Sequence, residues 1–338
     1  MKIILGLVLG LAVAAGVNVP RADAADRVKV VTSVAGLIFA PVYIAQQQGY
    51  FKAAGLDVTV QDGNGGSNAV AAIVGGSAQI GIIGFKNVTQ AVDKGQALKL
   101  VGTGLRGFPQ TLVIRPDLAA ELKVTPASTL AEKGAALRGR NIAVTDIGGS
   151  TGDFARLILR AGGVADDQAT VVNITTIAGQ LAALKARRID AFVNSSPAGE
   201  IATADGYGVE LVVPARDLRD VTDIEYTVQT VRQDFLEKNP AVVERYLGAV
   251  QKALDLIRTD PNKAKAAAYD FFAEQANTDE AFPAAIRDAA WANLLPHFPA
   301  TVVLDPAKVK ASRIFLKASD ISPDAVLIDN RLASKVAP

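Results

Sequence analysis

Apolar and polar residues alternate between short extended runs and helical repeats along most of this chain. The valine-rich segment 28–34 predicts a buried strand, and the apolar positions Leu56, Val58 and Val60 predict a second one. Further strands are expected at 80–84 and 99–102, and the helices expected between the four strands lie at 41–48, 69–74 and 88–94. This order predicts an α/β fold with a mainly parallel sheet.

The same order then begins again further along the chain. Strands are expected at 141–146, 170–174 and 189–193, with helices at 153–161 and 179–186. Segments 72–82 and 183–193 share a rhythm of helix, small or polar turn, and strand. We interpret the second block as a second unit with the architecture of the first.

Two β-branched stretches, 111–114 and 224–231, lie beside these blocks and are typical of extended chain. We expect them to be the two crossings between the units. Residues 240–335 are expected to be mostly helical, because apolar positions recur at spacings of three and four after Pro240: Val243, Tyr246, Leu247, Val250, Leu254 and Ile257.

The first 24 residues have the layout of a secretory signal peptide. Lys2 precedes an apolar stretch from Ile3 to Val17, and Ala22-Asp23-Ala24 is a small–x–small cleavage site. The apolar stretch is shorter than the ~20 residues of a spanning helix. We therefore expect export, cleavage after Ala24 and a periplasmic destination. No cysteine follows the signal, so no lipid anchor is expected.

Composition removes several classes of function. With 35 basic and 34 acidic residues, the chain lacks the basic excess of a nucleic-acid binder. It has no cysteine and one histidine, which removes thiol nucleophiles, thiolate metal sites and a multi-histidine metal cage. His297 is expected to be a packed or surface residue, and no Gly-x-Ser-x-Gly elbow occurs. We expect no enzyme, cofactor or metal.

Several segments together carry a family resemblance. They are 41–45, Gly49-Tyr50-Phe51, Gly55-Leu56-Asp57-Val58, 76–81, 137–144 and 189–191. With these segments the sequence resembles the solute-binding proteins of the sulfonate/nitrate/taurine class of ABC importers (the SsuA/TauA/NrtA type), which also contains pyrimidine-precursor-binding proteins. The resemblance covers roughly residues 28–240 and is most specific at Gly49–Phe51 and Gly55–Val58.

The resemblance implies a two-lobed periplasmic binding protein fold of type II, with two chain crossings and the ligand in the cleft between the lobes. The expected division places 25–115 and 222–338 in the first lobe and 116–221 in the second. The implied partners are a small solute and an ABC permease at the inner membrane, with the protein itself a monomer.

The expected ligand is a small anionic or zwitterionic organic solute of sulfonate, taurine, nitrate or carboxylate type. An aromatic or pyrimidine-type ligand is the alternative, since Phe39, Phe85, Phe108 and Phe154 supply stacking area. A sensing subunit with the same fold, or a secreted enzyme, is the second alternative.

Ligands of open α/β sheets bind beyond the carboxyl ends of the strands, so the loops after the strands supply the candidate site. Among them, Gly148 to Asp153 is the strongest local signal, because a glycine-rich turn there opens a helix. The resemblance implies that its Ser/Thr pair faces the anionic head of the ligand. The candidate ligand-binding residues are Ser33, Phe39, Gly65, Ser67, Phe85, Lys86, Asn87, Gly149, Ser150, Thr151, Asn194, Ser195 and Tyr226.

Some of these candidates have a second interpretation. Lys86 is the only cation in the loops after the first three strands, so it pairs with an anionic ligand or lies solvated on the rim. Segment 63–68 either seats an anion at a helix start or is an ordinary N-cap. Phe39 is a cleft wall or a core residue. Asp153 complements a helix dipole or faces a donor on the ligand.

Overall fold

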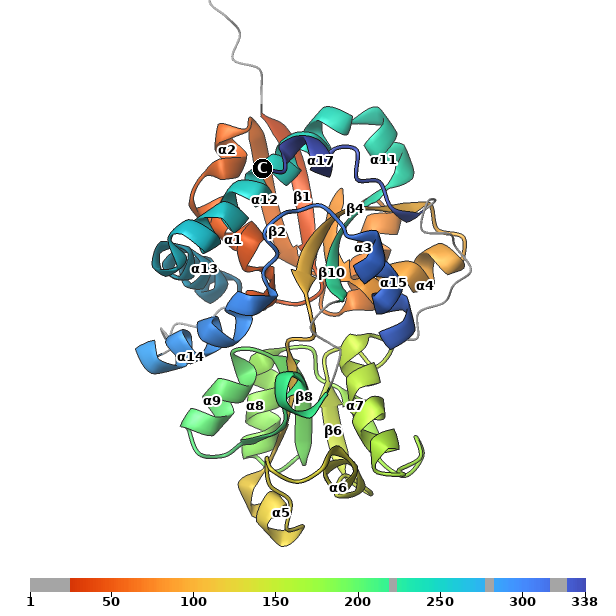
Figure 1. Ribbon diagram of the computed structural model, residues 1–338, viewed down its shortest axis with the longest axis vertical. Coiled ribbons are helices and arrows are strands. Elements are labelled where there is room, and N and C mark those ends of the chain that lie inside the picture. The colour runs from red at the N-terminus through yellow and green to blue at the C-terminus, as the bar shows by residue number, and fades with distance from the viewer. Residues whose placement is uncertain (1–24, 219–223, 277–282, 317–326) are drawn as a thin grey trace, which may run out of the picture.

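The computed structural model describes residues 25–218, 224–276, 283–316 and 327–338. The expected signal peptide, residues 1–24, lies outside the described residues. Within them the strands form two five-stranded sheets, each at the centre of one lobe, and the lobes are stacked along the long axis of the molecule (Figure 1). The prediction of a two-lobed α/β fold is confirmed.

The first sheet has the strand order β2-β1-β3-β10-β4. Strand β1 pairs in parallel with β2 and β3, whereas β10 runs antiparallel to both β3 and β4. The expected helices between the strands are present. The elements are β1 (Asp26–Thr32), α1 (Ala40–Gln47), β2 (Leu56–Asp62), α3 (Gly66–Val74), β3 (Ile80–Gly84), α4 (Phe85–Asp93), β4 (Leu98–Arg106) and β10 (Glu225–Arg232).

The second sheet has the order β7-β6-β8-β5-β9 and repeats the first. Its antiparallel strand, β5, again occupies the fourth place. The shared helix–turn–strand rhythm corresponds to α3–β3 and α8–β8, which end in the third strand of each sheet. The elements are β5 (Gln110–Ile114), β6 (Asn141–Val144), α7 (Ser150–Ala161), β7 (Thr170–Asn173), α8 (Ile177–Lys185), β8 (Ala191–Ser195), α9 (Ala198–Ala204) and β9 (Val209–Val212).

The two expected crossing stretches are strands inside the lobes. Strand β5 pairs with β8 and β9, so it belongs to the second lobe, whereas the expected first lobe ran to residue 115. The chain passes between the sheets after β4 and returns between α10 (Pro214–Asp217) and β10. The amide N–H of Gly107 donates to the carbonyl oxygen of Ile224 at 2.8 Å, so the two connections lie side by side.

Helices of the C-terminal third cover the first lobe. Helix α12 (Pro240–Thr259) packs against α1 and α13, and its six predicted apolar positions are buried. No helix of the described residues is both long and apolar enough to cross a membrane. The other helices are η1 (Leu37–Phe39), α2 (Tyr50–Ala53), α5 (Pro116–Glu121), α6 (Leu130–Ala135), α11 (Gln233–Lys238), α13 (Pro261–Ala276), α14 (Ala284–Leu294), η2 (Leu295–His297), α15 (Pro306–Phe315) and α17 (Ala333–Val336).

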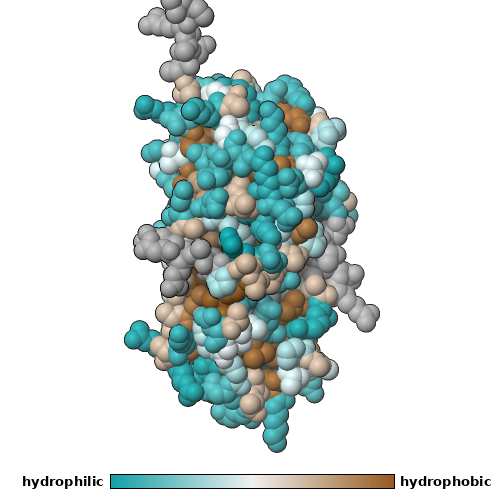
Figure 2. Space-filling model, turned by 90° about the vertical axis from the view of Figure 1, so that its left-hand side faces the viewer, coloured by the Kyte–Doolittle hydropathy of each residue, from teal (hydrophilic) through white to brown (hydrophobic). Residues whose placement is uncertain are grey.

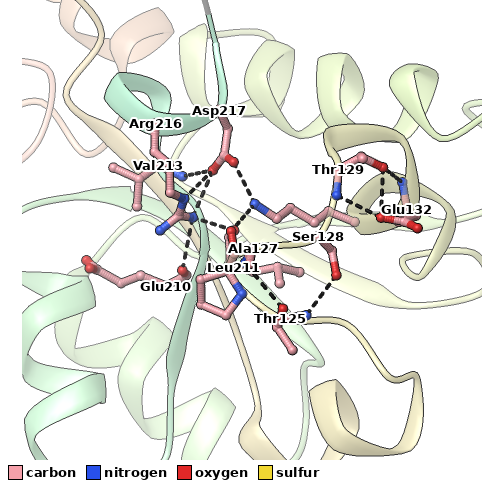
Figure 3. Close-up of polar contacts among 12 residues, drawn as sticks. Thr125, Ala127, Ser128, Thr129, Glu132, Glu210, Leu211, Val213, Arg216 and Asp217 are labelled. Carbon is pink, nitrogen blue, oxygen red and sulfur yellow. Dashed lines mark hydrogen bonds and ion pairs between the residues drawn. The ribbon is translucent and has the colours of Figure 1, made fainter.

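A buried ion pair fastens α6 to α10 in the second lobe (Figure 3). The side chain of Lys133 is fully buried, and its Nζ donates to Asp217 Oδ1 at 2.6 Å and to the carbonyl oxygen of Pro126 at 2.7 Å. Burial opposes ionisation of Asp217, but hydrogen bonds from Arg216 and Lys133 outweigh it and lower the pKa of Asp217. Asp217 therefore stays charged, just before the chain returns to the first lobe.

Candidate functional site

A small cavity of about 40 Å³ lies between the lobes. Hydrophobic atoms gather on the surface near mid-height, where the lobes meet (Figure 2). The cavity walls come from strand ends and helix starts of both sheets. The lining residues are Ser33, Val34, Ile38, Phe39, Gly66, Gly84, Asn87, Gln110, Thr145, Asp146, Gly149, Ser150, Thr151, Asn194, Ser195, Tyr226 and Thr227.

Most of the candidate residues from the sequence are brought together here. Phe39 is almost fully buried and also lines the cavity, so it is both core and wall. The predicted residues that line the cavity are Ser33, Phe39, Asn87, Gly149, Ser150, Thr151, Asn194, Ser195 and Tyr226. Their contact with a ligand stays a prediction.

Three side chains form a hydrogen-bonded cluster in the cavity wall. The phenol of Tyr226, from the first lobe, lies 3.0 Å from Ser150 Oγ and accepts from Gln110 Nε2, both of the second lobe. Burial raises the pKa of Tyr226 well above its ordinary value, against the hydrogen bonds of Ser150 and Gln110. Tyr226 therefore acts as a neutral hydrogen-bonding group.

This cluster leaves one donor and one acceptor to spare. Ser150 and Tyr226 have two hydroxyl protons and use one of them in their mutual bond, so one proton is left for a further acceptor. Gln110 is 1% exposed, and its Oε1 has no hydrogen-bond partner among the described residues. Buried polar atoms of this kind are normally paired. The wall therefore suits a molecule that both donates and accepts.

Asp146 connects the two lobes beside this cluster. It follows β6, and its Oδ2 accepts from the Ser67 backbone N–H at 3.0 Å, from Ser67 Oγ at 2.9 Å and from Asn87 Nδ2 at 3.2 Å. Its Oδ1 accepts from the Gly148 N–H at 2.9 Å. Ser67, which the sequence suggested for ligand contact, therefore contacts a protein carboxylate and does not line the cavity.

Glycines make room for Asn87 at the start of α4. A Cβ atom on Gly66 would lie 2.6 Å from Asn87 Oδ1, and one on Gly84 would lie 3.0 Å from it. Both glycines line the cavity. Gly65, the candidate from the sequence, lies one residue outside the lining and has a φ of 119°, which favours glycine.

Lys86 pairs with Asp153 across the cleft and lies outside the cavity lining. Their side chains are 11% and 22% exposed, and Arg156 NH1 lies 3.6 Å from the same carboxylate. Burial raises the pKa of Asp153, although Lys86 and Arg156 oppose the rise. The sequence left Lys86 as a ligand cation or a solvated rim residue, and the structure places it in an ion pair that lines a second pocket. Its contact with a ligand stays a prediction.

Two of the candidate phenylalanines lie in packed positions. Phe85 has no exposed surface and does not line the cavity, because it begins α4 against the core. Phe108 lies in the connection between β4 and β5, where its ring contacts those of Phe154, Tyr226 and Phe315 at centroid distances of 4.9, 5.3 and 5.4 Å. Phe108, Phe154 and Phe315 also line a second pocket, together with Lys86 and Asp153.

Glu225, His297 and Arg106 hold the base of the first lobe. The fully buried carboxylate of Glu225 accepts from Arg106 Nε at 3.2 Å and from the Asp305 N–H at 3.3 Å. His297 Nδ1 lies 2.8 Å from the carbonyl oxygen of Arg106, and burial lowers the pKa of His297. His297, expected to be a packed or surface residue, is half-buried and bonded to the backbone.

Sequence reasoning missed Gln110, Thr145, Asp146 and Thr227 of the lining. Gln110 and Thr227 lie near the beginnings of β5 and β10, which run antiparallel to their neighbours. The first residues of β5 and β10 therefore lie beside the carboxyl ends of the parallel strands. The sequence rule considered only residues that follow a strand, so it could not identify residues at the beginning of one. Thr145 and Asp146 follow β6 directly, so that rule could have found them.

The described residues contain no cluster of three or more His, Asp and Glu side chains that could hold a metal ion. The polar groups of the cavity are hydroxyls, amides, one carboxylate and backbone atoms. This arrangement is suited to hydrogen bonding with a small molecule.

Comparisons with solved structures show the fold. A protein of Bordetella bronchiseptica RB50 is 23% identical, with a TM-score of 0.76, covering 92% of this chain and 96% of that one. The alkanesulfonate-binding protein SsuA of Xanthomonas axonopodis pv. citri, bound to MOPS, is 17% identical, with a TM-score of 0.69 and coverages of 90% and 98%. The periplasmic nitrate-binding protein NrtA of Synechocystis PCC 6803 is 16% identical, with a TM-score of 0.67 and coverages of 92% and 88%.

Sequence comparison supplies the family. None of the curated proteins matches the chain. A model of the NMT1/THI5-like family, however, matches residues 38–264, from η1, which follows β1, to the beginning of α13. Because that match extends over more than half of the sequence, the protein belongs to the NMT1/THI5-like family.

Proposed function

We propose that this protein is the substrate-binding subunit of an ABC importer. The observation that carries the proposal is the cavity whose walls come from both lobes. A ligand there contacts both lobes only when they are closed, so binding favours the closed form. A closed form presents a distinct surface that a permease can recognise.

The proposed cargo is a small polar organic solute. The sequence favours an anionic or zwitterionic solute, and hydroxyl and amide groups of Ser150, Asn194 and Tyr226 support a polar head group. Of these two classes we place zwitterions first, because Asp146 is the one charged side chain among the described lining residues. An aromatic or pyrimidine-type solute is the alternative, supported by the ring surfaces of Phe39 and Tyr226.

A binding role is favoured over an enzymatic one by the state of the reactive groups. Tyr226 is held neutral, and the one histidine, His297, is bonded to a backbone carbonyl. Ser150 bonds to a phenol and an amide, neither of which is a general base at neutral pH. A sensing subunit would use the same cavity, and co-purification with a receptor kinase in place of a permease would identify it.

The proposed setting is the periplasm, reached with the signal peptide of residues 1–24 cleaved after Ala24. There the protein, as a monomer, delivers its solute to a permease at the inner membrane. A strain lacking the protein should lose uptake of the solute, and the gene without the signal segment should not restore it.

A thermal-shift panel tests the binding proposal. The chain from Ala25 is unfolded and refolded to remove bound solute, then mixed with taurine, alkanesulfonates, nitrate, small carboxylates, aromatic acids, amides and pyrimidines. A specific solute at 100 times its dissociation constant stabilises the protein by about 2.7 kcal/mol. Ser33→Ala, in the cavity, should weaken the shift, and Ser77→Ala, on an exposed turn, should not. A solute whose shift is unaffected by Ser33→Ala and other cavity substitutions would contradict the proposed site.

A further inference from the structure

The start of helix α3 is the place in the cleft where an anion would be expected. This nine-residue helix begins at Gly66, and its N-cap residue, Gly65, has no side chain that could accept from the free N–H groups. Helix N-termini attract negative charge through these N–H groups and the helix dipole. The first turn of α3 therefore needs an acceptor from outside the helix.

Asp146 of the second lobe supplies that acceptor. Its Oδ2 accepts from the N–H of Ser67, the second residue of α3, which is one of the bonds that an N-cap side chain normally makes. Ser67 Oγ and Asn87 Nδ2 donate to the same oxygen, and the Gly148 N–H donates to the other. An ionised carboxylate has about four acceptor sites, so Asp146 takes both donors of Ser67 together with those of Asn87 and Gly148.

The rest of the described lining offers an anion no compensating charge. It contains no lysine or arginine. The nearest candidate from the sequence, Lys86, is bonded to Asp153. A bare anion would therefore enter beside a like charge, in a partly dehydrated site where such repulsion is strong, and would find the Ser67 donors occupied.

We propose that Asp146 determines the charge specificity of the cavity by filling the anion seat of α3 with a carboxylate of the protein, which excludes bare anions. This inference rests on the proposed solute-binding function and sharpens it. The unpartnered acceptor Gln110 Oε1 lies in the same lining as the unpartnered hydroxyls of Ser33 and Thr227, so the lining calls for a solute that donates as well as accepts. Zwitterionic and uncharged solutes meet that need, and nitrate and methanesulfonate do not.

Substitution of Asp146 tests the proposal with two anions that lack donors. Wild-type protein should show no binding of nitrate or methanesulfonate by calorimetry up to about 10 mM. Asp146→Ala should bind both anions with a dissociation constant at least roughly tenfold below that limit. Asp146→Asn, which keeps the shape and removes the charge, is the second variant in case Asp146→Ala does not fold. Asp205→Asn, at the exposed end of α9, makes the same change in net charge and should behave as wild type.

Two results would overturn the inference. One is wild-type protein that binds the two anions as tightly as the Asp146 variants do. The other is folded Asp146 variants that still bind neither anion. The proposed transport function fails in a different way, if wild-type protein binds no member of the wider panel and its removal leaves uptake unchanged.

Discussion

At the scale of single residues, the cavity wall depends on one phenol that is shared by two partners from the other lobe. Tyr226 bonds to Ser150 and Gln110, and its ring packs edge-on against Phe108. The same side chain therefore contributes to interlobe bonding, to ring packing and to the polarity of the cavity.

Tyr226→Phe should weaken solute binding about tenfold and lower stability by about 1–3 kcal/mol. The substitution leaves the Gln110 amide and the Ser150 hydroxyl each short of a buried partner, and such groups carry a desolvation penalty. Calorimetric titration and urea unfolding measure the two effects. Tyr207→Phe, on a half-buried tyrosine of the second lobe, is the control. Unchanged solute affinity in Tyr226→Phe would remove the cluster from the binding site.

The sequence predicted lining residues correctly where their position after a strand is enough to bring them to the cavity. It failed where the direction of the side chain decides whether a residue lines the cavity. Ser150, Thr151 and Asn194 line the cavity because β6 and β8 end there. Lys86 and Phe85 follow β3 just as directly, yet one points to Asp153 and the other into the core. These directions depend on helix α7 and on packing, which are distant in the sequence.

At the scale of elements, buried ionisable side chains connect neighbouring elements of the second lobe. Lys133 of α6 bonds to Asp217 of α10. Glu210 of β9 lies close enough to Glu200 of α9 for the second carboxylate to raise the pKa of the first. The ion pair of Lys133 and Asp217 stabilises the lobe. The raised pKa of Glu210 makes the stability of the lobe decrease as the pH rises.

Lys133→Met should destabilise the protein by about 2–3 kcal/mol. Removing one partner of a buried ion pair typically costs 3–5 kcal/mol, and here Asp217 keeps its bond to Arg216, which reduces the loss. Urea unfolding at neutral pH measures the difference. Lys52→Met, on an exposed residue of α2, should stay within about 0.5 kcal/mol of wild type. An equal, small effect of both substitutions would contradict the structural role of Lys133.

Glu210→Gln should make the protein less sensitive to alkaline pH. Burial, with a further contribution from Glu200, raises the pKa of Glu210 to about 7, above its ordinary value of 4.5. The folded protein therefore holds this proton more tightly than the unfolded chain. Its stabilising effect is complete below pH 4.5 and is lost as the pH rises through about 7.

Urea unfolding at several pH values from 5 to 8 measures this effect. Wild-type stability should fall more steeply over that interval than that of Glu210→Gln. Glu121→Gln, on an exposed residue of the same lobe, should retain the wild-type slope. Parallel curves for wild type and Glu210→Gln would show that Glu210 titrates at its ordinary pKa.

Strand and helix positions were predictable because the hydrophobic periods of the chain are strong, as the match at β3 shows. The expected starts of α3, α4 and α7 came three residues late. The first turns of α3 and α7 consist of glycine and polar residues, and that of α4 has Phe85 as its one apolar residue. None of the three turns carries an apolar period, although the backbone is already helical. The assignment of β5 required knowledge of its pairing with β8, which the local sequence does not contain.

At the scale of the whole molecule, polar contacts between described residues hold the lobes together around the cavity at several places besides the Tyr226 cluster. Asp146 bonds to α3 and α4, Lys86 pairs with Asp153 between α4 and α7, and Asn293 Nδ2 of α14 donates to Glu200 Oε1 of α9 at 2.8 Å. The last two contacts lie outside the cavity lining, so they can influence closure without touching a solute.

Lys86→Met should shift the protein toward more open forms. It removes the α4–α7 ion pair and leaves the half-buried Asp153 with Arg156. Small-angle X-ray scattering without solute should show a larger radius of gyration, and solute affinity should fall by up to about tenfold because the closed form is less populated. Lys94→Met, at the exposed end of α4, is the matched control. Equal radii for both variants would show that this pair does not contribute to closure.

The two-lobed plan itself was predictable from the repeated rhythm, since α3–β3 and α8–β8 have equivalent places in the two sheets. The boundary between the lobes was harder to predict from the sequence. Segments 111–114 and 224–231 are equally β-branched whether they cross between lobes or pair within one, so the crossing at 107–109 could not be read from their composition.

The strand order has a consequence for the time at which each lobe can be completed. All strands of the second sheet lie within residues 110–212, one uninterrupted stretch of chain. In the first sheet, β4 reaches β3 only through β10, which ends at Arg232. As the chain emerges from a ribosome or a translocation pore, we therefore expect the second lobe to become resistant to protease before the first, and chains truncated after residue 218 would show this order. The lobe that the chain begins first is the one it finishes last.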